Sequence, residues 1–78
     1  MKLKYDYTLL DKKYSSVMNG ELKESDYKKI VNDKRFILKD EWNTQQKDCV
    51  VYSELYNITI NDELYHLFIG IEREIKNV

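Results

Sequence analysis

The residues able to carry out chemistry are few. The chain contains one cysteine, Cys49, one histidine, His66, and two glycines, Gly20 and Gly70. A zinc site built from cysteine and histidine normally takes four ligands, and a phosphate-binding loop needs a glycine-rich segment. The sequence supplies neither, so it predicts no metal, no cofactor and no catalytic residue.

A cysteine–histidine pair and a carboxylate pair are the remaining catalytic options. In the hairpin register argued below, His66 lies opposite Thr59, ten positions from Cys49, or about 33 Å at roughly 3.3 Å per residue. Glu72 and Glu74 are neighbours on one side of a predicted strand, whereas paired-carboxylate catalysis needs two groups facing each other across a cleft. We therefore predict that the protein is not an enzyme.

Residues 49–75 organise the chain as a predicted β-hairpin. Apolar residues alternate with polar ones in both arms, which is the pattern of half-buried strands. A polar break at 61–63, within a four-residue loop 61–64, separates the arms. With Ile60 opposite Tyr65, Ile58 would face Leu67, and both apolar rows would lie on one side of the sheet. The register is therefore predicted from the requirement to bury both rows together.

The other side of this hairpin is mixed in character. It carries Leu55 and Phe68, with Gly70 opposite Leu55 leaving room for a close approach. Two interpretations follow: a neighbouring helix covers the two side chains, which we prefer, or they form an exposed apolar patch that binds a partner.

The N-terminal segment fits two patterns. Residues 2–7 alternate as a short strand, and residues 9–19 have apolar side chains at helical spacing after a Thr8-to-Asp11 capping pattern. We predict a strand over 2–7 and a helix over 9–19 ending at Gly20, with a wholly helical N-terminal stretch as the alternative.

The middle of the chain predicts a second helix and a further strand. Apolar side chains recur at helical spacing over 25–33, with Ser25 as the cap, and residues 35–42 alternate before the polar loop 43–48. The predicted fold class is α+β: one domain, 1–78, with two short helices packed on an antiparallel three-stranded meander and an optional N-terminal strand, in the order β-α-α-β-β-β.

Composition places the chain among small globular domains. Its 78 residues are 42% hydrophobic and 35% charged, and no apolar run approaches the roughly 20 residues that span a bilayer. The N-terminal residues lack the apolar core of a secretory signal, and a single cysteine cannot form an internal disulfide. We therefore expect a cytoplasmic protein that does not enter a membrane, with a core small enough to benefit from self-association.

Charge is polarised along the chain. Residues 1–39 carry ten basic and six acidic side chains, a net of +4, and residues 40–78 carry three basic and eight acidic ones, a net of −5. The sequence leaves open whether the two charges lie on different faces or neutralise each other where the elements pack. In the first case the acidic surface comprises Asp40, Glu41, Asp48, Asp62, Glu63, Glu72 and Glu74.

These features lead to one preferred function and two alternatives. We expect a protein that binds another protein through the acidic sheet surface. The partner would have a basic surface, such as a bacterial defence nuclease inhibited by a phage or mobile-element protein of the anti-CRISPR kind. One alternative is a nucleic-acid-binding regulator with a helix-turn-helix. The other is a homodimeric structural or accessory subunit whose contact patch comprises Leu55, Phe68 and the exposed tyrosines. The nucleic-acid alternative uses the basic residues Lys12, Lys13, Lys28, Lys29, Lys34 and Arg35.

Overall fold

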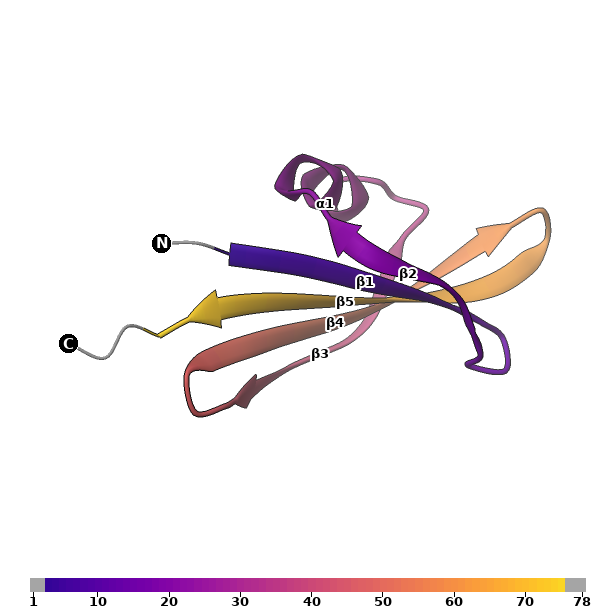
Figure 1. Ribbon diagram of the computed structural model, residues 1–78. Helices are drawn as coiled ribbons and strands as arrows, with labels where there is room; N and C mark the ends of the chain where they lie inside the picture. Colours follow the sequence, from indigo (N-terminus) through magenta and orange to yellow (C-terminus); the bar gives the residue numbers. More distant parts are fainter. Residues whose placement is uncertain (1–2, 76–78) are drawn as a thin grey trace.

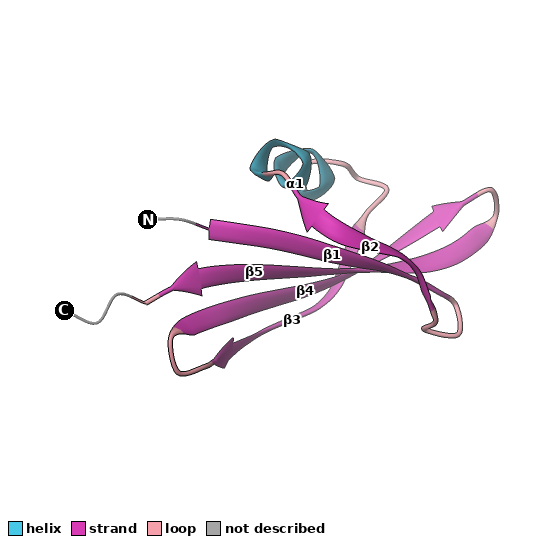
Figure 2. Ribbon diagram, viewed as in Figure 1, coloured by secondary structure: helices cyan, strands magenta, loops and turns pink. Residues whose placement is uncertain are grey.

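The computed structural model describes residues 3–75 as one antiparallel sheet with a single short helix (Figures 1 and 2). The five strands lie in the order β2-β1-β5-β4-β3, so that the last strand in the sequence is the central one. The predicted fold, two helices on a three-stranded meander, is wrong, because the protein is mostly β-sheet. Its elements are β1 (Leu3–Asp11), β2 (Ser16–Leu22), α1 (Glu24–Val31), β3 (Ile37–Gln45), β4 (Cys49–Ile60) and β5 (Glu63–Glu74).

The predicted helix over 9–19 is instead a strand, a turn and a second strand. The alternation that begins at Leu3 continues to Asp11, and β1 then pairs with β2. Asp11, which the capping pattern placed in a first helical turn, ends β1, and its side chain accepts hydrogen bonds from the backbone N–H groups of Lys13 and Ser15, both at 2.9 Å. Because pairing with β5 buries Tyr5 and half-buries Leu9, tertiary packing outweighs the helical spacing in this segment.

The predicted hairpin over 49–75 is confirmed, but its register is wrong by two residues. Ile58 lies opposite Tyr65 rather than Leu67, and Ile60 lies opposite Glu63. The turn is shorter than predicted because Asn61 and Asp62 both adopt positive φ values, 50° and 65°, as a two-residue hairpin turn requires. A two-residue shift preserves parity, so the same apolar rows still share a face.

The second predicted helix, over 25–33, is present as α1. Ser25 does not cap it: the N-cap position is Lys23, which makes no capping hydrogen bond through its side chain. Such a short helix depends on packing for its stability, and Tyr27 and Ile30 rest on the sheet. The following strand, predicted over 35–42, runs over Ile37–Gln45 in the structure.

The core lies between α1 and one face of the sheet, which we call the helix face. Its centre is Ile69, which is fully buried, together with Tyr56 and Leu67, which lie opposite each other on β4 and β5. The ring of Tyr27 packs against that of Tyr5 with their centroids 4.9 Å apart, joining the helix to β1. Because side chains alternate along strands, the neighbours of these residues point to the opposite side, which we call the open face.

Both edge strands of the sheet contain a β-bulge. The pairing of β1 with β2 skips Val17, and the pairing of β3 with β4 skips Lys39. All nine residues of β3 are exposed, and β2 is exposed except for Leu22. Bulges at exposed edges interrupt the regular ladder and disfavour uncontrolled pairing with other chains.

Candidate functional site

The open face has an aromatic centre. Trp42 of β3 and Phe68 of β5 lie in contact, with ring centroids 5.7 Å apart, although β4 separates their strands. Leu55 lies directly opposite Phe68, and Trp42 remains 42% exposed. The predicted apolar pair Leu55 and Phe68 therefore lies together, and α1 covers the other face rather than this one. The sequence pattern missed Trp42, whose parity relative to β4 is set by the bulge at Lys39.

His66 lies further along the open face and has structural contacts. It is buried, its Nδ1 lies 2.7 Å from Oδ1 of Asn57, and the ring of Tyr14 stacks on it at 4.2 Å with an interplanar angle of 3°. His66 pairs with Asn57 and not with Thr59. Its partner Asn57 is eight positions along β4 from Cys49, so His66 and Cys49 are about 26 Å apart at roughly 3.3 Å per residue. The two side chains therefore form no catalytic pair.

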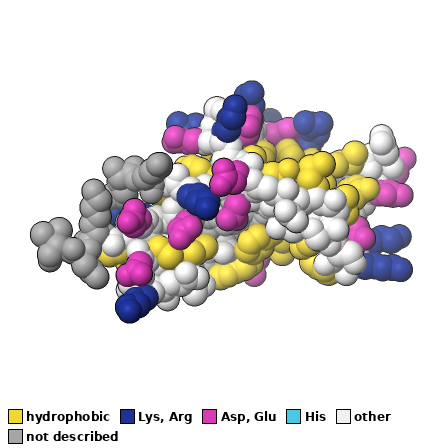
Figure 3. All heavy atoms as spheres, in the orientation of Figure 1, with side chains coloured by type: hydrophobic (Ala, Val, Ile, Leu, Met, Phe, Trp, Pro, Cys, Tyr) yellow, Lys and Arg dark blue, Asp and Glu magenta, His cyan; other side chains and the backbone are white. Residues whose placement is uncertain are grey.

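Carboxylates surround the aromatic centre on the open face. By strand pairing and parity, five acidic residues and one basic residue, Lys4, point to this side. Lys4 lies 3.9 Å from Glu21, within ion-pair distance, so little positive charge is left to offset the rest. Figure 3 shows acidic side chains grouped around a basic one on the left of the view. The five acidic residues are Asp6, Glu21, Asp40, Glu72 and Glu74.

The predicted acidic surface is thus brought together only in part. Glu72 and Glu74 lie beside Asp48 at a hollow of about 860 Å³. Asp62 lies in the β4–β5 turn and Glu63 begins β5, at the other end of this twelve-residue strand and roughly 36 Å from Glu74. The seven predicted residues do not form one patch, because Asp40 and Glu41 also point to opposite faces of β3.

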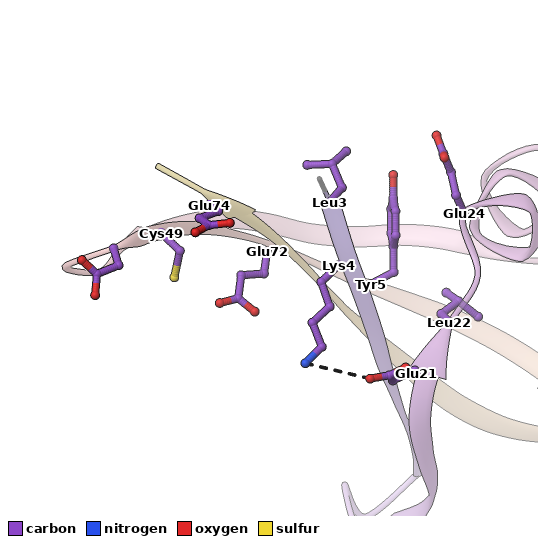
Figure 4. Close-up of a pocket in the computed structure, with 10 residues that line it drawn as sticks. Leu3, Lys4, Tyr5, Glu21, Leu22, Glu24, Cys49, Glu72 and Glu74 are labelled. Carbon is purple, nitrogen blue, oxygen red and sulfur yellow. Dashed lines mark ion pairs between the residues drawn. The ribbon is translucent and has the colours of Figure 1, made fainter. Parts of the chain in front are cut away.

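The hollow near Glu72 is divided by β1. Figure 4 shows Lys4, Glu21 and Glu72 on one side of this strand, whereas Tyr5 and Glu24 point to the other side. Leu3 and Leu22 complete the second side. The hollow is therefore two shallow surfaces meeting at a sheet end, and it does not enclose a small-molecule site.

Cys49 faces this same end of the sheet and is buried. Burial raises the pKa of its thiol, and the carboxylates of Glu72 and Asp48 raise that pKa further. The thiol also lies 3.4 Å from Oε1 of Gln46, to which it donates a hydrogen bond. These contacts favour the protonated, unreactive form of the side chain.

The basic residues predicted to contact nucleic acid are dispersed. Lys12 and Lys13 lie in the β1–β2 turn, Lys28 and Lys29 lie in the last turn of α1, and Lys34 and Arg35 follow the helix. Arg35 is paired with Asp33 at 2.7 Å. The predicted helix-turn-helix is wrong because its first helix is the β1–β2 hairpin.

A second acidic feature lies on the helix face beside β3. Glu41 and Glu54 are directly opposite each other across β3 and β4, and the hydroxyl of Tyr27 donates a hydrogen bond to Oε1 of Glu54 at 2.7 Å. A groove of about 410 Å³, lined in part by Tyr52, adjoins the two glutamates. In the sequence they are thirteen positions apart, and only the β3–β4 register brings them together.

Two further features are absent from the part of the chain that the structure describes. Residues 3–75 contain no cluster of three or more histidine, cysteine, aspartate or glutamate side chains placed to hold a metal ion. Over the same residues, no helix has the length and apolar character needed to cross a membrane. Comparisons of the chain with protein-family models, with curated proteins and with solved structures give no match.

Proposed function

We propose that this protein is not an enzyme and acts by binding another protein through the open face of its sheet. The observation that supports this proposal is the exposed Trp42–Phe68 contact at the centre of a face with five acidic side chains. Aromatic centres with polar rims are typical of protein interfaces, in which a few buried aromatic anchors contribute most of the binding energy.

The charge of the open face favours a basic partner. Five carboxylates against one lysine would attract a positively charged surface and repel acidic ones, which affects association rate and specificity. The nucleic-acid channel of a nuclease or polymerase is such a surface. Inhibition of a bacterial defence nuclease by a phage or mobile-element protein is the specific form of the proposal, and it depends on this charge complementarity.

The test uses the tagged protein as bait in a bacterial lysate, with bound proteins identified by mass spectrometry. Replacing both Trp42 and Phe68 by serine should reduce recovery of the bound protein by about tenfold or more, as expected for hot-spot residues. The control replaces Val17 and Met18 by serine, because these exposed apolar residues lie on the opposite edge strand. Equal recovery by both variants would refute the open face as the binding surface.

A charge-reversal variant tests the electrostatic part of the proposal separately. Changing Glu72 and Glu74 to lysine should weaken binding to the recovered protein and reduce the dependence of the affinity on salt concentration. Circular dichroism would show that each variant retains the fold. An unchanged affinity and salt dependence would exclude the acidic rim from the interface.

A further inference from the structure

The β3 edge offers backbone hydrogen bonds that the sheet does not use. The N–H of Gln46 donates to the carbonyl of Cys49 at 2.8 Å, which makes residues 46 and 49 a hydrogen-bonded pair. In an antiparallel ladder such pairs alternate with non-hydrogen-bonded ones, so with the observed register the backbone groups of Glu41, Asn43 and Gln45 point outward. These three residues therefore form an open edge.

One observed contact supports this assignment independently. The backbone N–H of Glu41 donates a 2.8 Å hydrogen bond to Oδ1 of Asp40, the residue before it. A side chain can reach this N–H only if the group points away from β4. In the free protein the Asp40 carboxylate thus accepts the hydrogen bond from the Glu41 N–H that a backbone carbonyl of an added strand would otherwise accept.

The same alternation places Glu41 and Glu54 in a non-hydrogen-bonded pair, in which side chains approach most closely. Like charges directly opposite each other destabilise a sheet. Among residues 3–75, neither carboxylate takes part in an ion pair; the ion pairs in this part of the chain involve other acidic residues. A cation placed beside Glu41 would therefore relieve a repulsion present in the free protein.

We propose that the β3 edge accepts an extended basic segment of the partner as a sixth, antiparallel strand. A basic side chain opposite Glu41 would lie on the helix face, at the groove beside Glu54 and the ring of Tyr52. The next side chains of the segment would point to the open face near Trp42 and would be apolar. Strand addition of this kind gains affinity from backbone bonds and specificity from alternate side chains.

This inference rests on the proposed function and gives the partner a sequence character: arginine or lysine alternating with aliphatic residues. The open face and the β3 edge adjoin at Trp42, so one partner could occupy both. The ladder is interrupted at Lys39, before the three outward-facing residues, so the edge that they form is regular and can pair with an added strand.

The experiment measures fluorescence anisotropy of the labelled peptide Ser-Val-Arg-Val-Arg-Val-Ser added to the full chain. Asn43→Pro removes one outward N–H without breaking a bond to β4, whereas Asn43→Ala removes only the side chain. We expect saturable binding that Asn43→Pro weakens about tenfold or more and Asn43→Ala leaves within about twofold. A peptide with glutamate in place of both arginines should not bind.

Three results would overturn the proposal. They are no saturable binding of the arginine peptide, equal binding of the glutamate peptide, or equal affinities of the two Asn43 variants. Self-association that Asn43→Pro abolishes, measured by sedimentation at increasing concentration, would also overturn it by assigning the edge to a second copy of the chain.

A second experiment separates failure of strand addition at the β3 edge from failure of binding through the open face. The Asn43→Pro variant is also used as bait in the lysate experiment. A bound protein that this variant retains, and that the Trp42 and Phe68 variant loses, would refute strand addition while leaving open-face binding intact.

Discussion

At the residue scale, Cys49 shows how a lone thiol in this fold is kept unreactive. Burial is the largest cause of the raised pKa of its thiol, followed by the hydrogen-bonding and then the charge of the neighbouring Glu72 carboxylate. Only the thiolate reacts with electrophiles, so a higher pKa slows alkylation at neutral pH. The side chain is buried at this end of the sheet.

Glu72→Gln should accelerate alkylation of Cys49 because it removes a negative charge and lowers the pKa of the thiol. The expected increase in the rate with iodoacetamide at pH 8 is roughly two- to tenfold, since one pKa unit changes the thiolate fraction about tenfold. Glu63→Gln, at the far end of β5, is the matched control and should leave the rate unchanged. A rate that is the same in both variants would show that Glu72 does not influence the thiol.

At the element scale, the β4–β5 turn holds two non-glycine residues, Asn61 and Asp62, in the left-handed conformation. Asp62 has a φ of 65°, a left-handed conformation that glycine adopts without steric cost. Asp62→Gly should therefore raise the free energy of unfolding, by about 0.5–1 kcal/mol, measured by urea denaturation. Glu63→Gly, one residue later and within β5, should lower it instead. Stabilisation by both changes would contradict a conformational origin.

The elements also show how far the sequence predicts this fold. Period-2 alternation over 49–75 identified the hairpin and its two faces. Only one assignment of the residues to the two faces buries both apolar rows on the same side of the sheet. The alternation did not give the register, which depends on the positive φ values of Asn61 and Asp62. Residues 9–19 were misassigned because Leu10, Tyr14, Val17 and Met18 fit helical spacing, and only pairing of β1 with β5 decides between strand and helix.

The candidate site was less predictable than the fold. Leu55 and Phe68 were identified from their parity, but Trp42 joins them only because the bulge at Lys39 shifts β3. The pairing of Glu41 with Glu54 likewise requires the β3–β4 register. Interactions between distant strands, rather than local sequence pattern, bring these side chains together.

At the scale of the whole molecule, tyrosines in the core link stability to alkaline pH. Burial and the charge of Glu54 raise the pKa of Tyr56 to about 12, and Tyr27 is shifted in the same direction. The unfolded chain loses these protons near pH 10 and the folded protein only at higher pH. The stability due to this difference is thus present below pH 10 and lost as the pH rises toward 12.

The denaturation midpoint in urea should therefore fall steadily between pH 10 and pH 12. For each shifted tyrosine the expected loss is up to about 1.4 kcal/mol per pH unit. Tyr56→Phe should make this decline shallower, because phenylalanine has no proton to lose, even if the variant is less stable at pH 8. Parallel declines in the variant and the original protein would contradict the linkage to Tyr56.

The position of β5 between β1 and β4 also determines when the sheet can form during synthesis. Leu3 pairs with Arg73, so the ribosome makes four strands before the one that joins them. Before β5 pairs with them, the β1–β2 and β3–β4 hairpins have no strand between them, and unpaired strand edges of this kind favour aggregation during folding. The pairing of β1 with β5 joins residues up to about 70 positions apart, so the sheet is completed by a contact of high sequence separation, which slows folding.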